Sequence, residues 1–332
     1  MLKLGIIGTN WITNQFVDAA IASKDYELTA IYSRNEASAL TFGAPYGVTK
    51  VKTELSEFVS LPELDVIYIA SPNSLHFQQA KLAIEQGKHV IVEKPAVSTS
   101  AELAEVVALA KEKNCFYFEA ARNIHEASFK KVTEILPQAQ DIIGANFSFM
   151  KYSSRYDLVL AGEEPNIFST AFSGGALMDL GVYVVYAAVA WFGKPESVHY
   201  FARKVPTGVD GIGTMVLRYE NFDVNLMTGK IGNSFLPSEI YSLDETIVLN
   251  AVNSIESIKV YDRHQGAFKE VEAAPEEVPM IAEARDFAAV INHPTDESWQ
   301  HAYQEWLAIA QDVHLIMEEL RKQADIVFPA DN

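Results

Sequence analysis

The chain has 332 residues, of which 49% are hydrophobic and 21% are charged, so it can form two globular domains with full cores. Its formal net charge of −18 argues against nucleic-acid binding, because a phosphate backbone requires a basic surface. The one cysteine, Cys115, excludes an intramolecular disulfide and a cysteine-rich zinc site.

Short β-branched runs alternate with longer amphipathic stretches over residues 1–121. The predicted strands are 3–7, 28–32, 66–70, 89–92 and 115–119, and the predicted helices include 11–23, 36–43, 75–86 and 101–113. Apolar strands that alternate with helices indicate a parallel sheet covered on both faces. Residues 1–121 are therefore predicted to form a doubly wound α/β domain with its ligand at the carboxyl ends of the strands.

The turn after the first predicted strand, "GIIGTNWIT", is close to the dinucleotide fingerprint G-x-G-x-x-G/A. Gly8 is the first glycine, whereas Asn10 and Thr13 replace the second and third. Asparagine tolerates positive φ, so we expect Asn10 to adopt that conformation and its amide to reach a phosphate oxygen. The helix N-terminus attracts anions as well. The expected cofactor contacts in this turn are Gly8, Thr9, Asn10, Trp11 and Ile12.

The end of the second predicted strand carries Ser33 and Arg34, about 25 residues after Gly8. An NAD site would place an acidic residue here to bind the ribose hydroxyls. A hydroxyl followed by a guanidinium suits a 2′-phosphate instead, so the sequence favours NADP over NAD. The alternative interpretation of Arg34 is an exposed arginine in a turn.

Alternating runs such as "GANFSFMKY", "GIGTMVLRYE" and "DVNLMTGKI" replace the earlier pattern after about residue 121. They predict a large, open and mainly antiparallel sheet. Helices are expected near 175–192, 280–292 and 300–323. Residues 122–332 are therefore predicted to form an α+β domain for substrate binding and oligomerisation. One large α/β domain is the alternative.

Two further segments carry a family resemblance. "VIYIASPNSLHFQQAKLAIEQGKHVIVEKP" spans residues 66–95, and "GGALMDLGVYVVYAAVAWFG" spans residues 174–193. In this order, and with the first turn, they make the chain resemble the glucose–fructose oxidoreductase/inositol dehydrogenase/MocA family. The resemblance implies a Rossmann domain, an open-sheet domain, a bound NAD(P), hydride transfer on sugars, polyols or diols, and frequent dimers or tetramers. It also implies cofactor contacts at Ser33, Arg34, Ser71, Pro72, Asn73, His76, Glu93 and Lys94.

The chemistry of the second segment fits such a reaction. Asp179, Tyr183 and Tyr186 are spaced by four and three residues, so they share a helix face. Lys94 can stabilise a developing alkoxide, Tyr183 can donate a proton, and Asp179 can bind Lys94 or a substrate hydroxyl. Tyrosine at position 183 is similar to the dihydrodiol dehydrogenase branch, whereas inositol dehydrogenases carry histidine there. A core aromatic is the alternative for Tyr183 and the favoured interpretation for Tyr186.

Other polar residues near the predicted strand ends have open interpretations. Arg122 is expected to contact the nicotinamide or an acidic substrate, or to form a surface ion pair. Tyr152, Arg155 and Tyr156 are candidates for a substrate rim or a dimer contact. The histidines show no metal-ligand spacing, so no metal is predicted.

The leading hypothesis is an NADP-dependent oxidoreductase that acts on a sugar, a diol or a related carbonyl compound. A catalytically silent NAD(P)-binding sensor is the alternative, since the fingerprint is altered. No basic leader or long apolar span is apparent, so a cytoplasmic location without a membrane or nucleic-acid partner is expected. Apolar residues on both faces of the predicted sheet, such as Phe147 and Phe149 opposite Met150 and Tyr152, predict a homodimer packed sheet to sheet.

Overall fold

The computed structural model describes residues 1–332 and divides into two compact units. The first unit consists of Met1–Ala120 and Glu276–Ala308, and the second of Ala121–Pro275 and Ile309–Asn332. The sequence led us to expect two contiguous segments, 1–121 and 122–332. The structure differs because a late segment, 276–308, folds with the N-terminal unit.

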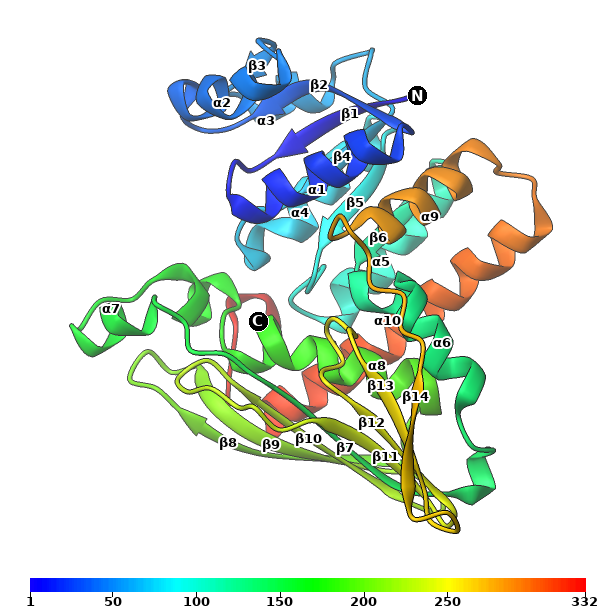
Figure 1. The fold of residues 1–332 in the computed structure, drawn as a ribbon. Coiled ribbons are helices and arrows are strands. Elements are labelled where there is room, and N and C mark those ends of the chain that lie inside the picture. Colours follow the sequence, from blue (N-terminus) through cyan, green and yellow to red (C-terminus); the bar gives the residue numbers. More distant parts are fainter. The chain divides into compact units, whose positions relative to one another are not determined.

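The first unit is built on a six-stranded parallel sheet of strand order β3-β2-β1-β4-β5-β6 (Figure 1). Its strands are β1 (Leu2–Ile7), β2 (Tyr26–Tyr32), β3 (Val51–Lys52), β4 (Val66–Ile69), β5 (His89–Glu93) and β6 (Tyr117–Ala120). Its helices are α1 (Trp11–Ser23), α2 (Glu36–Gly43), α3 (Leu55–Val59), α4 (His76–Glu85), α5 (Ser100–Glu112), α9 (Ile281–Asn292) and the first part of α10 (Glu297–Gln323). The doubly wound parallel sheet predicted from the sequence is confirmed.

The core of this unit explains why residues 276–308 belong to it. Phe118 of β6 stacks on Phe287 of α9, with 4.6 Å between the ring centroids. The hydroxyl of Tyr26 donates to the carbonyl oxygen of Ala284 at 2.8 Å, and both residues are buried. The apolar face of α9 therefore covers the sheet beside α1 and cannot be left in solvent.

The strand order reverses between β1 and β4, and this reversal positions the candidate site. The chain winds from β1 towards β3 on one side and from β4 towards β6 on the other. In such sheets the loops that leave the two central strands diverge and leave room for a ligand at their carboxyl ends. Gly8 follows β1 and Ser71 follows β4 at this point.

The second unit contains an eight-stranded sheet of order β14-β13-β12-β11-β7-β10-β9-β8. Its strands are β7 (Ile142–Met150), β8 (Ser197–Lys204), β9 (Asp210–Arg218), β10 (Asp223–Gly229), β11 (Ser238–Ser242), β12 (Glu245–Leu249), β13 (Ile258–Asp262) and β14 (Ala267–Val271). Its helices are α6 (Ala127–Ile135), α7 (Tyr156–Leu160), α8 (Val182–Phe192) and the second part of α10. The mainly antiparallel sheet is confirmed, although β7 and β10 pair in parallel.

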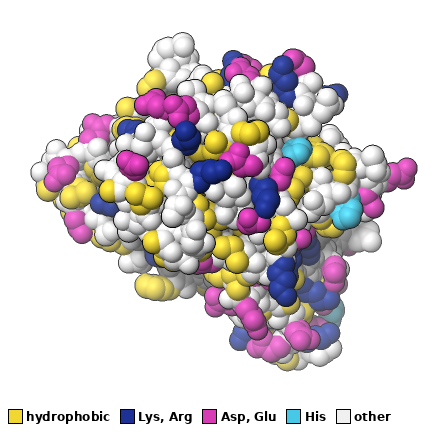
Figure 2. Space-filling model, turned by 90° about the horizontal axis from the view of Figure 1, so that it is seen from above, with side chains coloured by type: hydrophobic (Ala, Val, Ile, Leu, Met, Phe, Trp, Pro, Cys, Tyr) yellow, Lys and Arg dark blue, Asp and Glu magenta, His cyan; other side chains and the backbone are white.

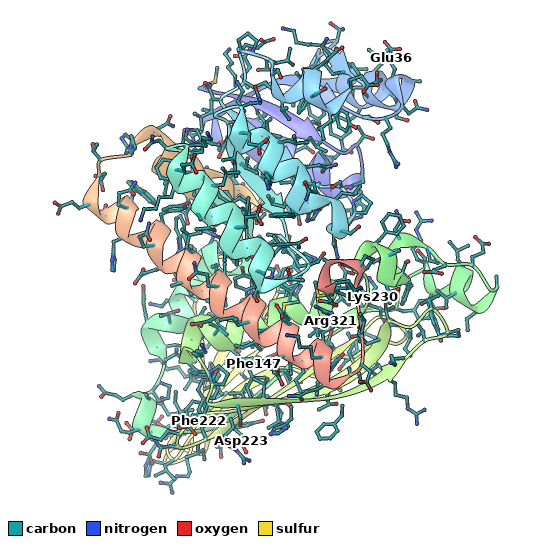
Figure 3. The ribbon with its side chains drawn as sticks, turned by 180° about the vertical axis from the view of Figure 1, so that it is seen from behind. Glu36, Phe147, Phe222, Asp223, Lys230 and Arg321 are labelled. Carbon is teal, nitrogen blue, oxygen red and sulfur yellow. The ribbon has the colours of Figure 1, made fainter.

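One face of this sheet packs against the apolar helix α8. Phe147 of β7 is fully buried, and its ring lies 5.4 Å from that of Trp191 in α8 (Phe147 is labelled in Figure 3). The stretch Thr170–Phe192 is long and apolar enough to span a membrane by length and composition, but 72% of its most apolar window is buried inside the protein. It is therefore explained as the core segment of this unit.

The opposite face of the sheet is mixed in character. A row of cross-strand neighbours runs over all eight strands through His199, Val216, Asn225, Asn146, Glu239, Val248, Lys259 and Glu270. Aromatic side chains lie two residues along, at Tyr241, Tyr261 and Phe268. This face is less apolar than the sequence pattern suggested, and Tyr152 lies beyond the end of β7.

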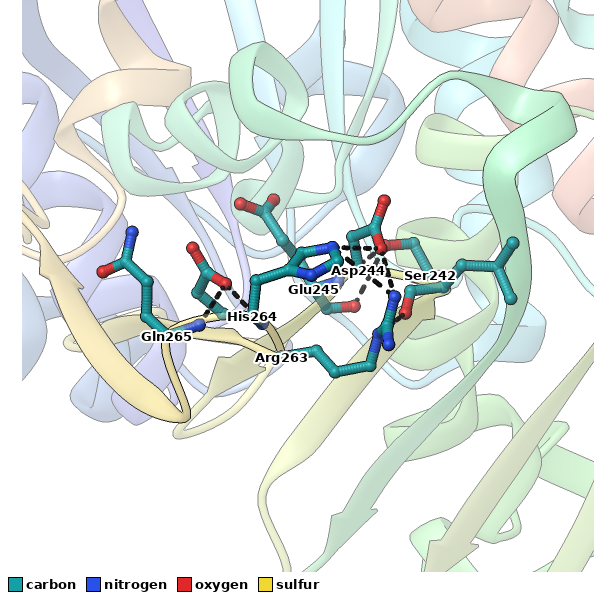
Figure 4. A network of polar contacts seen from close by, with 8 residues as sticks. Ser242, Asp244, Glu245, Arg263, His264 and Gln265 are labelled. Carbon is teal, nitrogen blue, oxygen red and sulfur yellow. Dashed lines mark hydrogen bonds and ion pairs between the residues drawn. The ribbon is translucent and has the colours of Figure 1, made fainter.

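Polar contacts join two neighbouring turns at one edge of the sheet. Asp244 follows β11 and accepts hydrogen bonds from Arg263 and His264, which follow β13, at 2.8 Å each (Figure 4). All three side chains are more than half exposed, so the pairs fix the turns more than they stabilise the fold. Acidic and basic side chains are likewise interspersed on the face of the molecule that Figure 2 shows.

Candidate active site

The turn between β1 and α1 brings the backbone close to the neighbouring strand. Gly8 has φ 104°, and a Cβ atom there would lie 2.6 Å from the carbonyl oxygen of Ala70. Only glycine fits both the conformation and this approach. The turn therefore has no side chain at Gly8, which lets a phosphate approach the backbone at the strand ends.

Asn10 has a different role from the one that the sequence suggested. Its φ is −92° and its ψ is 179°, so the expected positive φ is wrong. Its Oδ1 accepts from the backbone N–H groups of Ile12 at 3.0 Å and Thr13 at 3.2 Å, and its Nδ2 donates to Ala70 O at 2.8 Å. Asn10 is therefore the N-cap of α1 and ties this helix to the end of β4, and its expected contact with a phosphate oxygen stays a prediction. Thr13 is fully buried.

The end of β2 leaves Arg34 exposed. Ser33 is half-buried, and its Oγ accepts from Asn35 N–H at 3.2 Å. Asn35 in turn caps α2, accepting from Ser38 N–H at 2.9 Å. Arg34 forms no ion pair within the chain, and the neighbouring Glu36 starts α2 (Figure 3). The guanidinium is therefore available to an external anion.

The loop after β4 is tied to the loop after β5 by one buried histidine. His76 is 1% exposed; its Nε2 lies 2.8 Å from Ser71 O and its Nδ1 3.0 Å from Pro95 O. Burial lowers the pKa of His76, although the two carbonyl contacts and Glu119 oppose this shift. We therefore interpret His76 as a positioning residue for both loops, and its expected contact along the cofactor stays a prediction.

The segment that carries Lys94 is fixed by side chains from neighbouring strands. Glu93 is buried, and its Oε1 accepts from the hydroxyl of Tyr68 in β4 at 2.5 Å. Ala96 N–H donates to Glu119 Oε1 of β6 at 3.0 Å. The Lys94–Pro95 peptide is cis, and the Lys94 side chain is half-buried. The lysine thus projects from a segment that has little freedom to move.

Sequence reasoning missed Tyr68 and Glu119, although both left a signal. Each is a polar-tipped or charged residue inside a strand that is otherwise apolar, in "VIYI" and "YFEA". A carboxylate in a buried strand requires a hydrogen-bond partner. Glu119 accepts from the backbone N–H of Ala96, and Tyr68 donates to the Glu93 side chain, so the two contacts lie on either side of Lys94 and Pro95.

In the second unit, a π-helical turn, Leu177–Gly181, precedes α8 and carries Asp179. Asp210 anchors its start, because its Oδ2 accepts from Leu177 N–H and from the Tyr200 hydroxyl, both at 2.6 Å. Burial raises the pKa of Asp210, although these hydrogen bonds oppose the shift. Asp210 was not identified from the sequence.

Asp179 and Tyr183 are both partly exposed, whereas Tyr186 is 2% exposed. The interpretation of Tyr186 as a core aromatic therefore holds. Tyr183 packs edge-on against Phe149, with 5.6 Å between the ring centroids. Asp179 forms an ion pair with Lys230, which follows β10. The sequence did not reveal this partner, since the two residues are 51 positions apart.

Arg122, in the short helix Arg122–His125, lies in the second unit and is 20% exposed. Its Nη2 donates to Asn253 O at 3.4 Å, and its Nε lies 4.0 Å from Glu126 Oε1. The Nε of Arg122 is buried and forms no hydrogen bond, so the contact with Glu126 is weak, and the expected contact with the nicotinamide or an acidic substrate stays a prediction. Tyr152 donates to Asp157 Oδ1 at 2.6 Å and lies at the surface with Arg155.

The first unit is doubly wound and carries a glycine turn of the phosphate-binding type, and the second unit contains a large open sheet. This combination is typical of two-domain oxidoreductases with a Rossmann domain. Comparison with protein families gives the particular family. The profile described as "Oxidoreductase family, NAD-binding Rossmann fold" matches residues 2–121, and that of the GFO/IDH/MocA C-terminal domain matches residues 142–235. The chain belongs to the GFO/IDH/MocA family, as the sequence motifs predicted.

Individual relatives are similar over much or all of the chain. The scyllo-inositol 2-dehydrogenase (NADP(+)) IolU of Bacillus subtilis is 38% identical over 100% of this chain and 99% of its own. Human trans-1,2-dihydrobenzene-1,2-diol dehydrogenase is 28% identical over 74% of this chain and 70% of its own. The 3-ketoreductase KijD10 of Actinomadura kijaniata, solved with NADP and TDP-benzene, superposes with a TM-score of 0.83 at 20% identity, covering 97% of both chains. The last likeness confirms the fold.

Proposed function

We propose that this chain is an NADP-dependent oxidoreductase that moves a hydride between the nicotinamide and a carbon bearing a hydroxyl or carbonyl group in a polyol, sugar or diol. The observation that carries the proposal is the full-length similarity to a scyllo-inositol 2-dehydrogenase that uses NADP(+). The strand ends of this chain carry residues that suit the same cofactor. NADP supplies or accepts the hydride when it is bound.

The first unit provides the groups that would hold the dinucleotide. Gly8 leaves the turn without a side chain, and Thr9 and Trp11 flank the N-terminus of α1, where the helix dipole favours a pyrophosphate. Ser33 and Arg34 suit a 2′-phosphate, and neither position carries the acidic residue that is typical of an NAD site. Ile12, Ser71, Pro72 and Asn73 complete the expected contacts along the strand ends.

Three side chains carry the chemistry in this proposal. Lys94 places an ammonium group where an alkoxide develops, and Tyr183 donates or receives the proton of the substrate oxygen. Asp179 accepts a hydrogen bond from a second hydroxyl of the substrate. A substrate with neighbouring hydroxyl groups suits these three roles, because one hydroxyl can react while the next binds to Asp179. We therefore prefer a cyclic polyol or a diol as the substrate.

The test is turnover of the purified protein with NADP+ or NAD+ against inositols, aldoses, trans-diols and simple alcohols, followed by absorbance of the reduced nicotinamide. Turnover with NADP+ and a polyol or diol is expected. A protein that binds NADP+ but turns over none of these compounds would instead be the silent sensor.

We further propose that the chain works in the cytoplasm as a homodimer or dimer of dimers. The aromatic residues Tyr241, Tyr261 and Phe268 on the face of the second sheet away from α8 support a self-complementary contact there. The single cysteine is buried, so no disulfide is needed and a reducing compartment suits the chain. Light scattering at micromolar concentration, with Val248→Arg as a disruptive variant, tests the assembly.

A further inference from the structure

Lys230 is a buried cation directly beside the proposed substrate site of the second unit. It follows β10, its side chain is 3% exposed, and its ammonium pairs with Oδ2 of Asp179 (Figure 3 labels Lys230). The ammonium also lies 5.5 Å from the ring centroid of the buried Phe168. A cation this deep is held by its partners, because burying it unpaired would be costly.

The backbone of Lys230 also holds the segment that follows β7. Ser153 N–H donates to Lys230 O at 2.9 Å, and Lys151 N–H donates to Gly229 O at 3.0 Å. Aromatic residues of this segment also connect it to Phe168, the ring beside the Lys230 ammonium. The rings of Tyr152 and Tyr156 are 6.1 Å apart, and those of Tyr156 and Phe168 are 5.7 Å apart.

Lys230 therefore lies where two parts of the second unit meet, namely the π-helical turn with Asp179 and the exposed segment 151–157. The Asp179 side chain is 24% exposed, so part of it reaches solvent beside the buried ammonium. An adjacent buried ammonium favours the ionised carboxylate. An ionised carboxylate only accepts hydrogen bonds, so a substrate group that binds to it must be a donor.

We propose that Lys230 is a specificity-determining positioning residue, which keeps Asp179 ionised and oriented so that the site takes substrates with a free hydroxyl donor. It rests on the proposed function, because Asp179 is assigned there to a second substrate hydroxyl. Vicinal diols and polyols bind well in this arrangement. Substrates that present a carboxylate at the same place are rejected by like charge, and those without the second hydroxyl lack the hydrogen bond to Asp179.

The test compares Lys230→Met, Lys230→Arg, Asp179→Asn and the double variant Asp179→Asn/Lys230→Met. Methionine keeps the length and packing of lysine without its charge. With the best polyol or diol, Lys230→Met should raise KM by about tenfold or more, since a charged hydrogen bond is lost or misdirected. The Kd of NADPH should stay unchanged, and Lys230→Arg should recover part of the loss.

The double variant separates positioning from packing. If Lys230 acts through Asp179, the double variant should have the KM of Asp179→Asn alone. It also removes both charges, so it should fold even where Asp179→Asn leaves the buried ammonium unpaired. Lys194→Met is the matched control, because Lys194 pairs with Asp312 at the surface and is 59% exposed. It should change neither KM nor stability appreciably.

The discrimination between substrates gives a second readout. Relative to wild type, Lys230→Met should lose most of its preference for a diol over the corresponding mono-alcohol. An unchanged preference and KM in Lys230→Met, or losses that add in the double variant, would overturn the proposal. A wild-type protein without any polyol or diol turnover would instead overturn the proposed function on which it rests.

Discussion

The imidazole of His76 lies 3.0 Å from the carbonyl oxygen of Pro95, the residue that follows Lys94. On its other side the ring contacts Ser71 O at 2.8 Å. One buried side chain thereby connects the loop after β4 to the loop that presents the lysine. The same ring has a lowered pKa through burial, so its role can be tested by stability as a function of pH.

We expect the wild type to lose stability as the pH falls below about 6.5, the usual pKa of histidine. The unfolded chain then takes up a proton at residue 76 that the folded protein resists, so the free energy of unfolding decreases. His76→Gln should be less stable at pH 8 by about 0.5–1.5 kcal/mol for a lost hydrogen bond, and should have a shallower pH dependence. Urea unfolding at several pH values measures both effects.

Equal pH dependence in the wild type and His76→Gln would contradict the positioning role of His76. His301→Gln is the control, because His301 is exposed on α10.

Asn10 gives a prediction that depends on the observed backbone. Asn10→Ala removes an N-cap and should cost about 0.5–2 kcal/mol of stability. Asn10→Val should cost a similar amount, because φ −92° is open to β-branched residues. Thermal or chemical unfolding of the two variants makes the comparison. A valine variant that is far less stable than the alanine variant would point to a positive φ at this position.

The sequence predicted the strands and helices of the first unit well, because buried parallel strands and their helices leave strong periodic patterns. It missed β3 and α3, which have two and five residues and are too short for such a pattern. Segment 276–308 was assigned to the wrong unit, since amphipathic helices show which face is apolar but not which core receives it.

The candidate site was predicted in part for the same reason. Motifs identify residues that project from strand ends, such as Arg34 and Lys94. They do not identify partners that lie far away in the sequence, such as Lys230 beside Asp179 or His76 beside Pro95. Such pairs depend on the register of neighbouring elements, which a single sequence does not encode locally.

Arg34 should decide between the two nicotinamide cofactors. Arg34→Ala should weaken NADPH binding by about tenfold or more, because a charged hydrogen bond to the 2′-phosphate contributes roughly 1.5–3 kcal/mol. NADH affinity should barely change, and Lys111→Ala, which removes an exposed cation from α5, should affect neither. Calorimetric titration of the wild type and both variants with NADPH and with NADH measures these affinities. Tighter binding of NADH than NADPH by the wild type would show that Ser33 and Arg34 do not read the phosphate.

The C-terminal segment should contribute to stability through the pair between Arg321 and Asp331, and this contribution should be lost at acid pH. Arg321 is 1% exposed, and two of its nitrogens donate to Asp331 at 2.5 and 2.6 Å (Arg321 is labelled in Figure 3). Burial would raise the pKa of Asp331, but the hydrogen bonds from Arg321 and Phe328 N–H outweigh it and lower the pKa. This pair therefore stabilises the fold above about pH 4 and loses its effect as the pH falls through the lowered pKa.

Asp331→Asn should destabilise the protein near the lower end of about 3–5 kcal/mol, since the buried guanidinium loses its charge partner while residue 331 is itself partly exposed. The stability of this variant should also lack the decrease that the Asp331 carboxylate causes in the wild type below about pH 4, because asparagine does not titrate. Denaturant unfolding at pH 7 and acid titration by circular dichroism measure the two effects. Wild-type stability in this variant would show that the C-terminal segment does not depend on the pair.

Lys94→Ala and Tyr183→Phe should each reduce turnover strongly while leaving NADPH binding nearly intact. In the proposed function, cofactor affinity arises mainly at the turn after β1 and at Arg34, whereas Lys94 and Tyr183 are assigned to the substrate oxygen. Loss of a general acid typically costs 10²–10⁴-fold, so Tyr183→Phe should lose roughly that much in kcat. Lys94→Ala should lose at least as much, because in the proposed function it removes the charge that stabilises the developing alkoxide. The double variant should lose less than the product of the single losses, since the two residues are assigned to the same proton.

Tyr186→Phe is the matched control: Tyr186 is buried in the same helix as Tyr183 and should keep wild-type kcat. Wild-type turnover in Tyr183→Phe, together with an inactive Lys94→Ala, would identify the lysine alone as the proton donor.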